Sequence, residues 1–162
     1  NLNEDLKKII SLNQIFLSKK NKPVKVWSSW NFNNNTNKHK QHLGTLHSIK
    51  RESYMSLNNF INFKKIKKVD FIKLDVDGHE LDVLKSGEKF LKDKKPVIFI
   101  EIAPYLYPEF GYKCSELITY IKKLKYSFYN EDLKRIKNID NYIKRITHGS
   151  SENFFLMNNY KT

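Results

Sequence analysis

Residues 69–80 read VDFIKLDVDGHE and carry the strongest structural signal in the chain. Their first seven residues form a largely apolar run that closes on an acid, which predicts a β-strand over 69–75. Gly78 then lets the backbone turn tightly and approach a ligand closely. Three leucines follow at helical spacing: Leu81, Leu84 and Leu91. They predict a helix over 79–92, so the stretch runs from strand through turn to helix.

The same order of elements continues toward the C-terminus. Pro96 precedes VIFIEI at 97–102, a run that is apolar on both faces, as is typical of a central parallel strand. Ser115 stands ahead of a predicted helix. Two strand-like runs, 126–129 and 154–157, close the chain. This alternation predicts a parallel α/β layout, in which ligands bind beyond the carboxyl ends of the strands.

The residues before this region give weaker signals. Apolar residues on one face predict a helix over 3–13, residues 24–27 alternate as a short strand would, and Ser56 is placed to cap another helix. His39 and His42 lie in a polar, asparagine-rich stretch. Because no cysteine and no acid stands near them, we do not favour a metal site there.

Composition bounds the class of protein. The 162 residues suffice for one domain, 1–162, and the net charge is +13, from 30 Lys+Arg against 17 Asp+Glu. Only three of the 30 are arginine, the residue best suited to nucleic-acid contacts, so a nucleic-acid partner is disfavoured. Cys114 is the only cysteine, which excludes a disulfide scaffold. With no long apolar run and no signal pattern, we expect a cytoplasmic protein without a transmembrane segment. The sequence does not indicate the oligomeric state.

Acidic residues collect where the two predicted parallel strands end. Asp75 and Asp77 follow the first strand and Glu101 lies near the end of the second, so we expect all three at one pocket mouth. A calcium loop of the EF-hand type fails, because it needs acids where Lys73 and Leu84 stand. A metal site of another geometry built on the three acids stays open, and we assign no metal. Capping of the following helix is a further alternative.

The block 69–101 closely resembles methyltransferases of the FkbM type. In that family a strand ends in K-x-D-x-E-G-x-E, a helix carries V-L-x-G, and the next strand reads P-x-x-x-x-E. Here the second acid is Asp77 in place of glutamate, and Ser86-Gly87 stands where Gly-Ala is usual. Weaker similarity covers nearly the whole chain.

The resemblance implies a Rossmann-like class I methyltransferase fold. Such a fold has three α/β/α layers and a mostly parallel sheet with antiparallel C-terminal strands, and its members bind S-adenosylmethionine. Most of them methylate hydroxyl groups of sugars, glycans or polyketides. The chain has no G-x-G turn for the cofactor. We therefore expect a fragment whose N-terminal strands are missing between the strand at 24–27 and that at 69–75. Alone, this fragment is expected to bind cofactor weakly and to be inactive.

The resemblance also suggests roles for single residues. Asp75 and Asp77 are expected to contact the cofactor and to act in catalysis, with His79 as a general base because its ordinary pKa is nearest neutrality. Four residues are assigned to binding a small-molecule or glycan acceptor: Lys73, Glu80, Glu101 and Tyr105. Tyr107 is a further candidate wall of that site. The alternative function is a non-catalytic basic module that binds an acidic glycan or nucleic acid.

Overall fold

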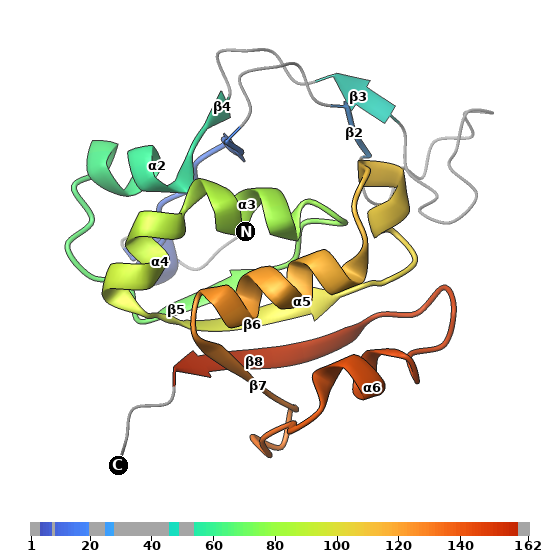
Figure 1. Cartoon of the computed structure of the whole chain (residues 1–162). Coiled ribbons are helices and arrows are strands. Elements are labelled where there is room, and N and C mark those ends of the chain that lie inside the picture. The colour runs from blue at the N-terminus through green and yellow to red at the C-terminus, as the bar shows by residue number, and fades with distance from the viewer. Residues whose placement is uncertain (1–3, 8, 20–24, 28–45, 49–53, 159–162) are drawn as a thin grey trace.

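A four-stranded sheet with strand order β5-β6-β8-β7 forms the centre of the computed structural model (Figure 1). The structure describes residues 4–7, 9–19, 25–27, 46–48 and 54–158. The sheet consists of β5 (Phe71–Leu74), β6 (Val97–Ile102), β7 (Tyr126–Tyr129) and β8 (Glu152–Asn158). His39 and His42 lie outside the described residues.

Only one pair of strands in this sheet is parallel. β5 runs parallel to β6, whereas β8 is antiparallel to both β6 and β7. The predicted antiparallel C-terminal strands are thus confirmed. The expectation of a mostly parallel sheet is wrong for the described residues, because β8 inserts between β6 and β7 from the opposite direction. The fold class is mixed α/β.

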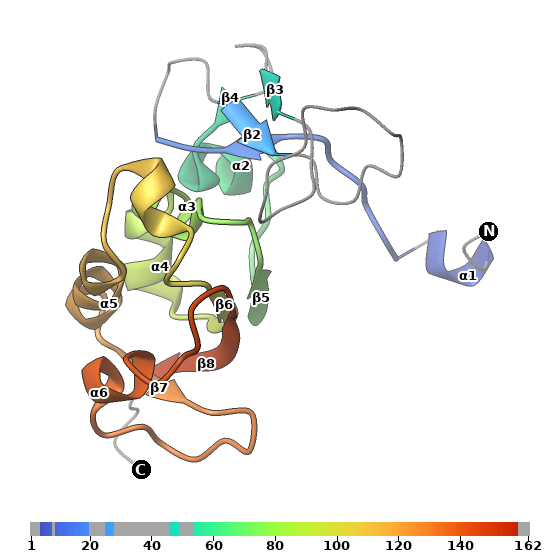
Figure 2. The same cartoon turned by 90° about the vertical axis from the view of Figure 1, so that its right-hand side faces the viewer.

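Helices cover one face of the sheet. They are α3 (Glu80–Ser86), α4 (Glu88–Lys94), α5 (Cys114–Lys123) and α6 (Ile139–Ile143), and Figure 2 shows α4, α5 and α6 on the same side. The side chains of β6 alternate accordingly, since Ile98, Ile100 and Ile102 are fully buried and the residues between them are half-buried. A three-layer arrangement is therefore not confirmed.

Glycine divides the helix that the leucine spacing predicts over 79–92. The helical hydrogen bonding of α3 ends at Gly87, and α4 begins at the next residue. A Cβ at Gly87 would lie 2.5 Å from Cδ2 of Leu57, so the backbone approaches α2 (Leu57–Phe63) closely at this point. The two short helices still bury the predicted leucines: Leu81, Leu84 and Leu91.

The other predicted helices occur with adjusted ends. Ser56 caps α2 as expected, because its Oγ accepts a hydrogen bond from the backbone N–H of Asn59 at 3.1 Å. α5 begins at Cys114, one residue before the predicted cap Ser115. The backbone N–H of Lys113 donates to Oε1 of Glu116 at 2.9 Å, and this bond fixes the start of α5. Within the described residues, no helix has the length and hydropathy to cross a membrane.

The N-terminal part differs most from the sequence expectations. α1 covers only Glu4–Lys7, much less than the predicted 3–13, and Figure 2 shows it apart from the main sheet. β1 (Phe16–Leu17) pairs in parallel with β4 (Tyr54–Met55). β2 (Lys25–Trp27) pairs antiparallel with β3 (Leu46–Ser48) in a separate two-stranded sheet. The strand at 24–27, of which residue 24 is not described, therefore does not join the main sheet.

Candidate functional site

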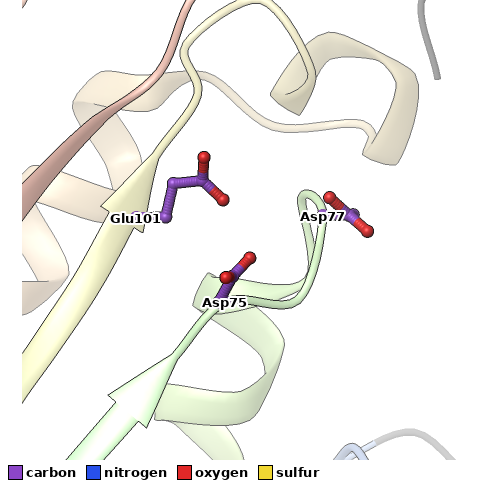
Figure 3. A group of neighbouring side chains, drawn as sticks. All are labelled: Asp75, Asp77 and Glu101. Carbon is purple, nitrogen blue, oxygen red and sulfur yellow. The ribbon is translucent and has the colours of Figure 1, made fainter. Parts of the chain in front are cut away.

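Three carboxylates meet at the carboxyl ends of β5 and β6 (Figure 3). Asp75 follows the last residue of β5, Asp77 stands in the turn beyond it, and Glu101 projects from β6. One carboxylate oxygen of each lies within 4.8 Å of the others. The structure thus confirms that the three acids gather at one edge of the sheet. Their functional roles are not tested by this placement.

A tight turn places Asp77 beside the other two acids. The backbone N–H of His79 donates to the carbonyl of Val76 at 3.2 Å, so Asp77 and Gly78 are the central turn residues. Both have positive φ, 46° and 95° respectively. Two successive positive φ angles characterise the mirror-image type I′ turn, for which Asp-Gly is a preferred pair. The sequence DG therefore makes the turn that carries one of the three acids.

The acids differ in their electrostatic surroundings. Lys73 forms an ion pair with Asp75, and this contact, followed by the hydrogen bond with Glu101, holds the pKa of Asp75 below its ordinary value. Burial raises the pKa of Glu101, and the neighbouring Asp75 raises it further, although Ser151 opposes this by donating a hydrogen bond to Oε1 of Glu101. Asp75 is thus the more readily ionised member of the pair.

An edge of this composition attracts cations and hydroxyl groups. Carboxylate oxygens are the ligands that hard divalent cations prefer, and they also complement an organic cation such as a sulfonium or an ammonium group. The three acids carry up to three negative charges, of which Lys73 offsets one. Among the residues that the structure describes, these three acids are the group whose spacing would allow them to bind a metal ion together.

His79 lies outside this group of three acids. Its ring packs edge-on against Phe16, with centroids 5.0 Å apart, and against Phe110, with centroids 4.4 Å apart. It lines a cavity of about 280 Å³ next to Gly78 and Tyr112. The imidazole is therefore held between two aromatic rings, and its role as a base stays a prediction.

Two further residues assigned to the acceptor take different positions. Glu80 is 3% exposed, and its Oε1 accepts hydrogen bonds from the backbone N–H groups of Val76 and Gly78. Tyr105 is half-buried, and its pKa is raised by burial and then by the charges of Glu101 and Asp77. The charges of Glu101 and Asp77 thus reach Tyr105, whereas Glu80 bonds the backbone of the turn.

Tyr107 cannot form a wall of the site. Its side chain is fully buried and stacks on Tyr112, with ring centroids 4.8 Å apart. Its hydroxyl accepts a hydrogen bond from the backbone N–H of Ala103 at 3.2 Å. The expectation that Tyr107 contacts a substrate was wrong, because the 3-10 helix η2 (Tyr107–Phe110) turns this ring into the core.

Sequence reasoning missed three residues that shape the site. Ser151 bonds Glu101, the hydroxyl of Tyr112 donates to the carbonyl of Gly78 at 2.8 Å, and Phe110 packs against Gly78. They come from segments that are distant in sequence, and no local pattern connects them to the DG turn. Only the tertiary structure brings them together.

Comparison with known proteins gives one match. A family model described as the methyltransferase FkbM domain matches residues 2–128, which include β5, the turn, α3 and β6. No curated protein and no solved structure matches the chain.

Proposed function

Because the chain belongs to the FkbM methyltransferase family, we propose that it transfers a methyl group from S-adenosylmethionine to a hydroxyl group of a sugar, glycan or polyketide. The observation that carries this proposal is the cluster of Asp75, Asp77 and Glu101 at the carboxyl ends of adjacent parallel strands. Binding sites of α/β proteins form at this edge.

The carboxylates of the site suit the proposed cofactor. S-adenosylmethionine, when bound, supplies a methyl group on a positively charged sulfur. Ionised carboxylates complement that charge and the ammonium group of the same molecule. Asp75, whose pKa is held low by Lys73, remains ionised at neutral pH and is well suited to this task. We assign Asp75 and Asp77 to holding the cofactor.

The remaining groups suit a hydroxyl acceptor. A hydroxyl group must lose its proton during the transfer, and a base works best when its pKa lies near the working pH. Burial and the charge of Asp75 raise the pKa of Glu101, which makes Glu101 the better base of this pair. Tyr105 lies within the electrostatic influence of Glu101 and Asp77, and we assign its ring and hydroxyl to binding a sugar. His79 stays a weaker candidate for the base, because its ring is packed between Phe16 and Phe110.

The glycine-rich cofactor turn of the family is not found in this sequence. In the part of the chain that is described, β5 pairs with β6 and has no partner on its other edge. The expectation that further strands pair at that edge and carry the turn stays a prediction. The cytoplasmic location also stays a prediction.

Calorimetric titration of S-adenosylmethionine into the full-length protein tests the proposal. Asp75→Asn and Asp77→Asn are expected to weaken binding by about tenfold or more, since each removes a charge-assisted contact. Asp70→Asn is the matched control, because Asp70 precedes the same strand but is exposed and pairs with Lys68. Circular dichroism should show that all three variants remain folded.

Two results would count against the proposal. If the full-length wild type does not bind S-adenosylmethionine, the function is wrong. If it binds and all three variants bind equally well, the function can stand but the assignment of Asp75 and Asp77 is wrong.

A basic groove supports a second candidate function, binding of an acidic glycan or nucleic acid. The groove has a volume of about 530 Å³ and lies near the C-terminal end of α3. Four lysines line it against two acids; the lysines are Lys19, Lys85, Lys89 and Lys92. Retention on heparin that falls steeply with salt would favour this function. This function would be excluded if the protein elutes from heparin at low ionic strength and if Lys89→Glu does not change the elution.

A further inference from the structure

The turn that carries Asp77 has a backbone conformation that few residue types adopt. Asp77 has φ 46° and Gly78 has φ 95°. Glycine adopts positive φ freely and aspartate does so more readily than most residues, but neither residue is confined to this region by its own preference. Such a conformation persists only where the surrounding structure fixes it. The contacts that hold this turn therefore determine where the Asp77 carboxylate stands.

Two of these contacts act on Gly78 from η2 and the loop after it. The ring of Phe110 packs so closely that a Cβ on Gly78 would lie 2.2 Å from its Cε2. The hydroxyl of Tyr112 donates a hydrogen bond of 2.8 Å to the carbonyl of Gly78. Together they fix one side of the turn and its carbonyl, but they leave the backbone N–H groups of the turn for another partner.

The carboxyl group of Glu80 supplies that partner. Its Oε1 lies 3.4 Å from the backbone N of Val76 and 3.3 Å from that of Gly78, on either side of Asp77. Both distances are at the long end for hydrogen bonds, so each bond is weak by itself. The two bonds act together because the two N–H groups share one acceptor. The other oxygen, Oε2, is buried and has no hydrogen-bond partner among the residues that the structure describes.

The environment of Glu80 is unusual for a carboxylate. The side chain is 3% exposed, and burial is the main cause that raises its pKa to about 7. The bonds from the backbone N–H groups oppose this shift, and the charge of Asp77 adds to it. Burial raises the pKa of Tyr107, Tyr112 and Cys114, and the charge of Glu80 adds to the shift of each. A buried acid with one unsatisfied oxygen is a costly way to stabilise a fold.

We propose that Glu80 is a positioning residue, which holds the backbone N–H groups of Val76 and Gly78 and thereby sets the Asp77 carboxylate beside Asp75 and Glu101. It acts through the turn and does not contact the acceptor. This changes the role that the sequence suggested for Glu80, namely binding of the acceptor. The effect on the turn is independent of the reaction, whereas any effect on cofactor binding rests on the proposed function.

Two variants of Glu80 separate its reach from its charge. Glu80→Gln keeps an acceptor oxygen at the same distance without the charge. Glu80→Asp keeps the carboxyl group but is one methylene shorter, so its oxygen is not expected to reach both N–H groups. The matched controls are Glu131→Gln and Glu131→Asp, because Glu131 is exposed and bonds the side chain of Asn153, not the backbone of the turn.

Amide hydrogen exchange in the full-length protein, followed by NMR, reads the turn directly. In Glu80→Asp, the amides of Val76 and Gly78 should exchange about tenfold faster than in the wild type, which is the loss expected for one net hydrogen bond. In Glu80→Gln they should stay within about twofold, because the amide oxygen replaces Oε1. The amides of α5 should be unaffected in both variants. Both control variants should match the wild type.

Titration of S-adenosylmethionine into the same samples separates this inference from the proposed function. Rescue of affinity by Glu80→Gln, together with loss in Glu80→Asp, supports both. If the wild type fails to bind the cofactor but the exchange pattern appears, the positioning role stands and the proposed function falls. If Glu80→Asp leaves the two amides unchanged, the positioning role is wrong. It is also wrong if both variants accelerate exchange equally throughout α3 and α5, since that pattern indicates a general packing role.

Discussion

Replacement of Gly78 by alanine should destabilise the protein more than the same change at any other described glycine with positive φ. Two effects add at this position. The φ of 95° lies beyond the left-handed region that an alanine tolerates, which costs about 1–2 kcal/mol. The new Cβ would also lie 2.2 and 2.5 Å from two ring carbons of Phe110. Displacing a packed ring typically costs a further 1–3 kcal/mol or so.

Gly111→Ala isolates the backbone effect. Gly111 has φ 78°, but a Cβ there would meet no heavy atom of the described residues within 4 Å. We therefore expect Gly111→Ala to lower the free energy of unfolding by about 1–2 kcal/mol and Gly78→Ala by about 2–5 kcal/mol. Urea-induced unfolding, followed by far-ultraviolet circular dichroism, measures both values.

A double mutant tests the cause of the difference. Removing the ring in Gly78→Ala/Phe110→Ala should relieve the overlap, so the cost of Gly78→Ala should fall to that of Gly111→Ala in this background. Equal destabilisation by Gly78→Ala and Gly111→Ala would refute the reasoning, because it would mean that Phe110 does not confine the turn.

Two further predictions concern buried polar groups. The folded-state pKa of Glu80, about 7, exceeds its ordinary value of 4.5, so the folded protein keeps a proton that the unfolded chain releases. The free energy of unfolding should thus fall by about 3 kcal/mol from pH 4.5 to 7, and Glu80→Gln should remove this part of the slope in urea titrations. The buried Oγ of Ser86 accepts a hydrogen bond of 3.0 Å from the backbone N–H of Leu57 and donates one of 2.8 Å to the carbonyl of Val83. Ser86→Ala should therefore lower the unfolding free energy by about 1–3 kcal/mol, whereas a loss no larger than that of exposed Ser115→Ala would contradict it.

Sequence patterns identified the elements around the candidate site because the local signals there agree. The run at 69–75, the glycine at 78 and the apolar run of 97–102 each favour one conformation, and the structure has β5, a tight turn and β6 at these places. Parallel pairing of β5 and β6 then brings Asp75 near Glu101 without any further information. The juxtaposition of the acids was thus predictable from the sequence.

Elsewhere the outcome depended on contacts that no short pattern encodes. The helix predicted over 3–13 is reduced to Glu4–Lys7, and Ile9 is 77% exposed, so its apolar face finds no partner among the described residues. A helix of this length needs tertiary packing to persist. The residues 130–152 show no clear period, yet they contain α6, whose Tyr142 packs edge-on against Phe154.

The DG turn shows why the acids were predictable while their support was not. Asp and Gly are the residue types that a type I′ turn selects, so the backbone requirement and the carboxylate come from the same two letters. The support comes from Glu80 and from Phe110 and Tyr112, which contact the turn through two hydrogen bonds, a ring contact and a third hydrogen bond respectively. Such contacts produce no repeating pattern in the sequence, because a single hydrogen bond or ring contact needs only one residue at one position. Loss of any of them should therefore alter the geometry of the acids while every strand and helix remains, which is the behaviour expected of positioning residues and not of the core.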